Sequence, residues 1–187
     1  VIATTVEQLD LAPARTDLAG AEVELVALPN RERMLTAALA AIAAAYDYIL
    51  IDCPPSLGLL TINALVAADS VLVPVQTEYY ALEGLARLLD TIDLVRRGPN
   101  PGLRLEGLLL TLHDGRNNLA RQVEAEVRGH FARETYETVI PRNVRLSESP
   151  SFGQPIILYD IRSLGARSYL DLAREFVERN APAAAHC

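Results

Sequence analysis

Two short, almost uninterrupted apolar runs restrict the fold of this chain more than any other feature. They are ILI at residues 49–51 and VLVPV at residues 71–75. A strand with apolar side chains on both faces has to be covered on both faces, which is typical of a parallel sheet lying between layers of helices. An antiparallel sheet with one solvated face would instead alternate apolar and polar residues. The two runs therefore predict an α/β fold.

Segments of strand and helix character alternate along the rest of the chain. Apolar runs predict strands at residues 6–14, 46–55, 70–76, 104–113, 137–142 and 154–160. The spacing of apolar residues predicts helices at 31–45, 61–68, 81–96, 118–131 and 165–179. This order predicts a doubly wound, mostly parallel sheet flanked by helices. We expect one domain over residues 1–180 and a disordered tail over 181–187.

Composition excludes several classes of protein. Half of the 187 residues are hydrophobic, so a mostly disordered chain is excluded. The net charge of −7 disfavours a wholly basic nucleic-acid-binding domain. Cys53 and Cys187 have no disulfide or metal-ligand spacing, and the sequence contains neither a membrane span nor a signal peptide pattern. All 17 basic residues are arginine, and residues 113–145 carry enough of them to allow a local arginine-bearing face.

Asp52 is the strongest candidate for a functional residue. It ends the apolar part of the run at 46–55 and precedes Pro54 and Pro55, which cannot donate to a β-ladder. Ligands of open parallel sheets bind at the carboxyl ends of strands. A carboxylate at that place can hold Mg²⁺ through water beside a phosphate. An aspartate that ends a strand and caps a turn has the same pattern, so both interpretations stay open.

The residues around Asp52 also carry a resemblance to a known family. ILIDCPPSLGLLTINAL resembles the Walker B and switch region of ParA-type (Soj-type) chromosome-partitioning ATPases, within the MinD/ParA group of P-loop proteins. Further strings resemble the same family in order and spacing, and together they cover essentially the whole chain. These strings are TTVEQLDLAPARTDLAGAEVEL, VQTEYYALEGLARLLDTI, LLLTLHDGRNNLARQV, TVIPRNVRLSESPSFGQPIILYD and GARSYLDLAREF.

The resemblance implies a fold and a function. The fold is that of a P-loop NTPase with its N-terminal strands and P-loop missing, because the family's Walker A string KGGxGKT is absent and the chain has no lysine. We therefore expect the chain to be the C-terminal two-thirds of such a protein, with that string about seventy residues before Val1. The intact protein would bind ATP and Mg²⁺, form an ATP-dependent homodimer and bind DNA non-specifically. A ParB-type centromere-binding partner would stimulate hydrolysis, and the protein would be cytoplasmic and nucleoid-associated.

The resemblance also assigns roles to nucleotide-binding residues. It implies that Asp52 is the catalytic Walker B carboxylate and the metal ligand, with Pro54 beside it. Pro141, Arg142 and Asn143, in the string IPRN, would lie near the base, where a proline ring and backbone could contact adenine. From the residues alone, the same string is an ordinary turn after a strand.

Three arginines are candidates for DNA binding. Arg116, Arg142 and Arg145 could contact phosphates, because planar guanidinium groups bind phosphate bidentately. The alternative is a solvated arginine face without a ligand.

Two further features have competing interpretations. EYYALEG at 78–84 by itself predicts a hydrophobic staple and core packing, whereas the resemblance implies a place near the subunit interface. His113 beside Asp114 is not expected to be a general acid or base, because no serine or cysteine nucleophile pattern lies nearby.

Two other functions are alternatives to the partitioning ATPase. A truncated, ParA-like interaction module would bind a partner protein or DNA without ATP turnover, and the absence of lysine favours it for this chain. A MinD-like regulator at a membrane would carry a basic amphipathic helix at its C-terminus. The string REFVERNAPAAAHC has two glutamates against two arginines and does not fit that pattern.

Overall fold

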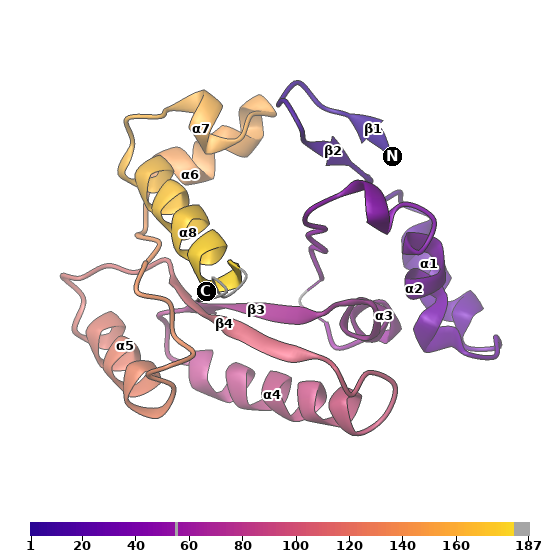
Figure 1. Ribbon diagram of the computed structural model, residues 1–187. Coiled ribbons are helices and arrows are strands. Elements are labelled where there is room, and N and C mark those ends of the chain that lie inside the picture. The colour runs from indigo at the N-terminus through magenta and orange to yellow at the C-terminus, as the bar shows by residue number, and fades with distance from the viewer. Residues whose placement is uncertain (55, 182–187) are drawn as a thin grey trace, which may run out of the picture. The chain divides into compact units, whose positions relative to one another are not determined.

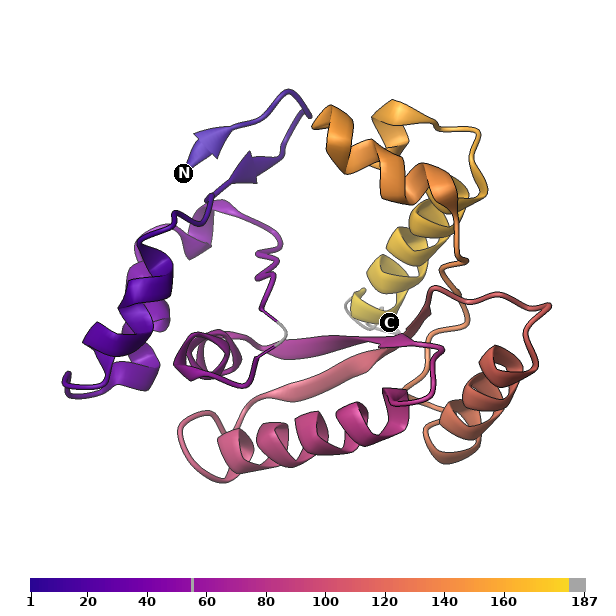
Figure 2. The same cartoon turned by 180° about the vertical axis from the view of Figure 1, so that it is seen from behind.

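The computed structural model describes residues 1–54 and 56–181. They form two compact units, one made of residues 1–68 with 94–102 and the other of residues 69–93 with 103–181. Figures 1 and 2 show the chain from opposite sides. Pro55 and residues 182–187 of the expected tail lie outside the described residues. The expectation of a single domain over residues 1–180 stays a prediction.

The second unit is built around two parallel strands, β3 (Ser70–Gln76) and β4 (Arg104–Thr111). The helix α4 (Ala81–Arg97) joins them, as a parallel pair requires. A third segment, which comes after α5 in the sequence, pairs with β4 and the loop after it at two isolated parallel bridges, Leu108 to Thr135 and His113 to Pro141. The parallel sheet that the apolar runs predict is therefore present. The expected strand at 137–142 is wrong as a continuous strand, because Pro141 is the one bridge residue in this range and the other five positions are irregular.

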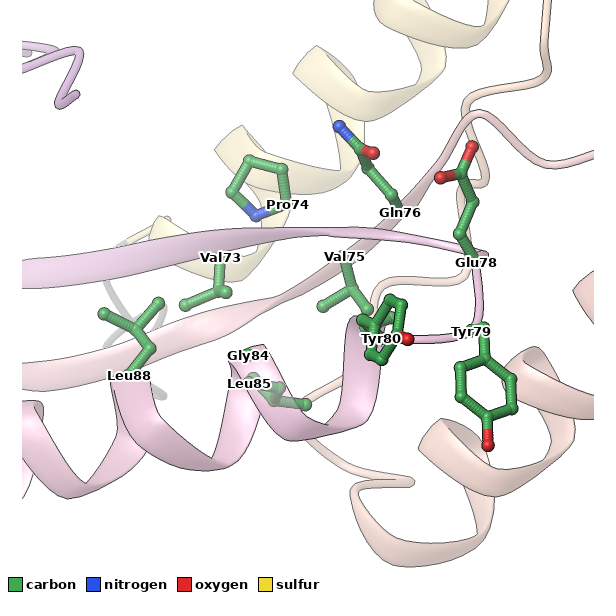
Figure 3. A pocket seen from close by; sticks show the side chains of 11 residues that line it. Val73, Pro74, Val75, Gln76, Glu78, Tyr79, Tyr80, Gly84, Leu85 and Leu88 are labelled. Atoms are coloured by element: carbon green, nitrogen blue, oxygen red, sulfur yellow. The ribbon is translucent and has the colours of Figure 1, made fainter. Parts of the chain in front are cut away.

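One face of the strand pair packs against α4. Val73 is paired with Leu108 and Val75 with Leu110, and all four side chains are buried. Figure 3 shows Val73 and Val75 pointing toward α4, whose buried apolar side chains include Leu85 and Ile92. The α5 helix (Asn118–His130) follows β4 and buries Ala120, Val123 and Val127.

The opposite face of the sheet is covered by α8 (Leu164–Asn180). Leu109 of β4 packs with Tyr136 and Ile140, and Leu172 and Phe176 of α8 lie against this cluster. Figures 1 and 2 both show α4 and α8 on opposite sides of β3 and β4. Helices on both faces of a parallel pair are the arrangement of a doubly wound α/β fold. Among the described residues, no helix is both long and apolar enough to cross a membrane.

The segment between the sheet and α8 is helical. It contains α6 (Val144–Glu148), η3 (Ser149–Phe152) and α7 (Ile156–Tyr159). The expected strand at 154–160 is therefore wrong. A short apolar run can form a helix or a strand, and Pro155 occupies the N-cap position of α7, where its missing N–H costs no helical hydrogen bond.

The first unit consists of a small hairpin followed by short helices. The hairpin pairs β1 (Ile2–Ala3) with β2 (Asp10–Leu11), so the expected strand at 6–14 is only two residues long. The helices are α1 (Leu18–Leu25), η1 (Arg31–Arg33), α2 (Met34–Leu39), η2 (Ala43–Ala45) and α3 (Leu59–Ala67). The expected helix at 31–45 is broken because Arg33 and Ile42 have non-helical backbone angles.

A buried asparagine joins three of these helices. The Nδ2 of Asn63 in α3 donates to the Arg31 carbonyl oxygen at 2.8 Å, and its Oδ1 accepts from the Leu35 N–H at 3.1 Å. Its amide thus fixes η1 and α2 against α3. Asn100 donates from Nδ2 to the carbonyl oxygens of Leu65 and Ala68 and so satisfies the C-terminal end of α3.

The expected strand at 46–55 is absent among the described residues. Tyr48 and Leu50 are 51% and 86% exposed, and no neighbouring strand pairs with residues 49–51. An apolar run becomes a strand only where a second backbone satisfies its N–H and C=O groups. The sequence pattern alone does not provide that partner.

Candidate functional site

A groove of about 430 Å³ lies at the carboxyl ends of β3 and β4. This is the edge at which open α/β sheets bind their ligands. Its polar lining comes from three places that are far apart in the sequence: the end of β3, the loop after β4 and the segment at 140–142. Its lining residues include Thr77, Glu78, Leu112, Asp114, Asn117 and Arg142.

Backbone hydrogen bonds bring these three segments together. The Thr77 N–H donates to the Thr111 carbonyl oxygen at 3.1 Å. The His113 N–H donates to the Ile140 carbonyl oxygen at 3.2 Å, and the Arg142 N–H donates to the His113 carbonyl oxygen at 2.9 Å. Between them Leu112 has a φ of 51°, a left-handed conformation that costs a non-glycine residue about 1–2 kcal/mol. The loop is thus held in a strained conformation by its neighbours.

Two of the candidate arginines meet around Asp114. Arg116 donates from Nε to Asp114 Oδ1 at 3.1 Å and from its backbone N–H to the same oxygen at 3.0 Å. Hydrogen bonds from the side chain and backbone of Arg116 hold the pKa of Asp114 below its ordinary value, and the charge of Arg142 acts in the same direction. Arg142 itself forms an ion pair with Glu78, with NH2 and Oε1 2.9 Å apart. The structure therefore places Arg142 in the lining of the groove and Arg116 on Asp114, which also lines it.

Arg145, the third candidate arginine, lies on α6 and has its own acidic partners. Its NH1 is 2.9 Å from Glu148 Oε2, and its Nε is 3.5 Å from Asp160 Oδ2. All three candidate arginines are thus paired with carboxylates, yet their side chains stay more than half exposed. Phosphates could reach them without displacing a core contact.

The other candidates for base binding differ in how free their side chains are. Asn143 is the N-cap of α6, and its Oδ1 accepts the Arg145 N–H at 2.9 Å. Pro141 is half-buried beside His113 in the third segment of the sheet. Asn143 is thus engaged in capping, whereas the ring of Pro141 remains available as an apolar surface.

Asp52 and Pro54 belong to the first unit and lie in an exposed, irregular segment. Desolvation raises the pKa of the neighbouring Cys53 thiol, and the charge of Asp52 raises it further. The Thr61 hydroxyl donates to the Ser56 carbonyl oxygen at 2.6 Å and ties the end of this loop to α3. Within the described residues no group of three or more His, Cys, Asp or Glu side chains is placed to hold a metal ion. The exposed Asp52 carboxylate fits Mg²⁺, which keeps several waters and takes one or two protein carboxylates.

A second groove, of about 480 Å³, lies between β3 and the start of α4 (Figure 3). Tyr79 and Tyr80 stand at its rim with their ring centroids 5.1 Å apart, and they are 74% and 75% exposed. The interpretation of these tyrosines as core packing is therefore wrong. They lie at the surface in the turn between β3 and α4.

Sequence reasoning missed Glu78, Asp114 and Asn117 as members of the first groove. Each is a polar residue within a few positions of a strand's carboxyl end, and that position was the available signal. Asp114 holds Arg116 and Glu78 holds Arg142, whereas the Asn117 side chain accepts the Leu119 N–H as the N-cap of α5. The groove therefore combines cations, carboxylates and an apolar edge.

Comparison with known proteins places this chain among close relatives. The sequence model of a family described as an AAA domain matches residues 1–105. The chromosome partitioning protein ParA of Myxococcus xanthus is 62% identical over 96% of this chain and 63% of its own length. The sporulation initiation inhibitor protein Soj of Bacillus subtilis is 63% identical over 92% of this chain and 68% of its own length. The chain thus spans about two-thirds of the length of these relatives.

A solved structure has the same fold. Cobyrinic acid a,c-diamide synthase from Mycobacterium smegmatis, with bound ADP and magnesium, superposes with a TM-score of 0.72 at 38% identity. The match covers 87% of this chain and 59% of that protein. A second structure of the same protein contains an ATP analogue and magnesium and matches equally well. The α/β architecture described above is thus that of nucleotide-binding P-loop proteins.

Proposed function

Because this chain belongs to the ParA/Soj family of chromosome-partitioning P-loop ATPases, we propose that the intact protein uses ATP binding and hydrolysis to move DNA. It binds ATP with Mg²⁺, forms a homodimer in that state and binds DNA without sequence preference. A ParB-type centromere-binding partner stimulates hydrolysis, and the protein works in the cytoplasm on the nucleoid. The observation that carries this proposal is the identity of 62–63% to two partitioning-type relatives over more than nine-tenths of the chain.

Asp52 is the residue that we assign to the metal. Bound Mg²⁺ would neutralise charge on the phosphates, and the Asp52 carboxylate would hold it through water. Pro54, two residues later, limits the conformations of the loop that carries this carboxylate. The exposure of the Asp52 carboxylate supports this role.

The base of the nucleotide is assigned to residues 141–143. The Pro141 ring and the neighbouring backbone supply an apolar contact for adenine, and Arg142 lies in the groove at the carboxyl ends of the strands. Asn143 acts by capping α6, which keeps this turn in place.

The DNA-binding face is assigned to Arg116, Arg142 and Arg145. Alanine at each position should weaken DNA binding by a similar factor for every sequence and reduce the slope of log affinity against log salt by about one unit. The assay is DNA binding of the intact, ATP-bound protein over a range of salt concentrations. Arg87→Ala is a matched control, because Arg87 is also exposed and ion-paired, with Glu83, but lies on α4. Unchanged binding and slope in all three variants would place the DNA face elsewhere.

The ATPase itself is tested by phosphate release. The intact protein should hydrolyse ATP faster when DNA and its centromere-binding partner are present, and Asp52→Ala should abolish this stimulation. The second candidate function is an interaction module without ATP turnover. It rests on the absence of lysine from these 187 residues, so that none of them can be the lysine of a P-loop. No phosphate release by the intact protein, with partner and DNA binding retained, would favour that candidate.

A further inference from the structure

His113 has a mostly buried side chain and lies between the loop that carries Arg116 and the segment that carries Arg142. Its backbone holds residues 140 and 142 through the two hydrogen bonds described above. It lies directly before Asp114, which binds Arg116, and directly after the strained Leu112. The position of its backbone therefore affects both Arg116 and Arg142.

The imidazole of His113 faces a carboxylate on α5. Its Nε2 is 3.0 Å from Glu124 Oε2, with side chains that are 16% and 27% exposed. The two atoms are close but not aligned as a hydrogen bond, and within the described part of the chain no other polar atom satisfies the buried Nε2. The contact therefore places the imidazole of His113 directly against the Glu124 carboxylate of α5.

Glu124 extends this contact to the rest of the unit. Its Oε1 accepts a hydrogen bond from Arg128 Nε at 3.0 Å, and Arg128 also donates from NH2 to the Glu137 carbonyl oxygen at 3.4 Å. The chain of contacts runs from the loop after β4, through α5, to the third segment of the sheet. These contacts therefore connect the loop that carries Arg116 with the segment that leads to Arg142.

We propose that His113 and Glu124 are positioning residues for the phosphate-binding arginines, a role that rests on the DNA binding proposed above. Their contact holds the loop that carries Arg116 and the turn that carries Arg142 at one spacing, so that both guanidinium groups reach the same DNA backbone. The groups charged near this contact are Glu124 and Arg128 of α5, Asp114 and Arg116 of the loop, Arg142, and Glu78 at the end of β3.

A simple charge effect predicts the opposite sign from positioning. Removing the negative charge of Glu124 makes this region more positive and frees Arg128, and both changes should tighten DNA binding. If Glu124 instead positions the loop, Glu124→Gln loosens one phosphate contact and weakens binding. The sign of the effect therefore separates the two explanations.

The experiment measures DNA binding by the intact, ATP-bound protein at several salt concentrations. Glu124→Gln and His113→Gln should each raise the Kd by about threefold or more and reduce the salt slope by up to about one unit. The double variant should be no weaker than the weaker single variant, because both residues act through one contact. Glu126→Gln, an exposed glutamate on the same helix, is the matched control and should bind as tightly as the wild type or slightly tighter.

An unfolding curve of each variant shows whether it is folded. If Glu124→Gln does not fold, DNA binding by His113→Gln tests the positioning role instead. Binding by Glu124→Gln that equals or exceeds that of Glu126→Gln would overturn the positioning role alone. Unchanged binding in the arginine variants would overturn the proposed DNA face, and this inference with it. Different variants therefore test the positioning role and the proposed DNA-binding face.

Discussion

At the scale of one residue, Gly107 shows how closely the backbone of β4 approaches residues 134–136. A Cβ at this position would lie 2.6 Å from the Glu134 carbonyl oxygen and 2.5 Å from Tyr136 Cε2. The carbonyl oxygen belongs to the backbone, which cannot give way without moving the bridged segment. We expect Gly107→Ala to lower the free energy of unfolding by about 1–3 kcal/mol, measured by denaturant titration.

Gly129 is the matched control for this substitution. It lies in α5, and a Cβ there would meet no atom within 4 Å. Gly129→Ala should therefore stabilise the protein by up to about 1 kcal/mol, because alanine loses less backbone entropy in a helix. Equal effects of the two substitutions would show that β4 and residues 134–136 are not packed as described.

At the scale of elements, α8 holds the third segment of the sheet through a mostly buried pair. Glu175 accepts the N–H groups of Glu137 and Thr138 at 2.8 and 2.9 Å, and Arg179 donates to Glu175 Oε1 at 2.7 Å. Arg179 also stacks over the Tyr136 ring, with its guanidinium carbon 3.9 Å from the ring centre. Desolvation alone would raise the pKa of Glu175, but the two N–H donors and the Arg179 charge lower it below its ordinary value of 4.5.

Glu175→Gln tests this clamp. A carboxyl group with a lowered pKa in the folded state stabilises that state above its unfolded pKa and loses this effect as the pH falls through the folded pKa. We expect the variant to be less stable than the wild type by about 2 kcal/mol at pH 7. The difference should shrink below pH 4.5. Glu178→Gln, on the exposed side of α8, should show no such difference at either pH. A gap that is independent of pH would contradict the ionic role of Glu175.

At the scale of the whole molecule, the protein is acidic, with 24 acidic residues against 17 arginines. A polyanion can therefore bind only at a local basic face of the protein. We expect ATP with Mg²⁺, in contrast, to raise the free energy of unfolding of the whole protein. With Mg²⁺ and ATP at about 100 times the Kd, the intact protein should gain about 2.7 kcal/mol in unfolding free energy. Asp52→Asn should reduce this gain.

Removal of the metal is the control for that prediction. With EDTA in place of Mg²⁺, the wild type and Asp52→Asn should be stabilised equally by ATP, because the substitution acts only through the ion. Thermal unfolding followed by circular dichroism measures both conditions. Equal stabilisation of the two proteins in the presence of Mg²⁺ would remove Asp52 from the metal site.

The local sequence was enough to predict the elements whose own apolar pattern decides them. The helices expected at 81–96, 118–131 and 165–179 are observed at Ala81–Arg97, Asn118–His130 and Leu164–Asn180. The strand expected at 70–76 is β3. Each has an amphipathic stripe or a continuous apolar run within a single segment, so neighbours in the sequence carry the signal. The family resemblance was confirmed by the comparisons, whereas the role of Asp52 stays a prediction.

Only the tertiary structure decided which segments pair and what surrounds the charged groups. The apolar runs ILI at 49–51 and IIL at 156–158 both predicted strands, yet the first lies in an irregular segment and the second belongs to α7. The Arg142–Glu78 pair joins residues 64 positions apart, and the His113–Glu124 contact depends on where α5 packs. A strand needs a second backbone, and an ion pair needs a partner brought close by folding. Neither partner is encoded in the local periodicity of the chain.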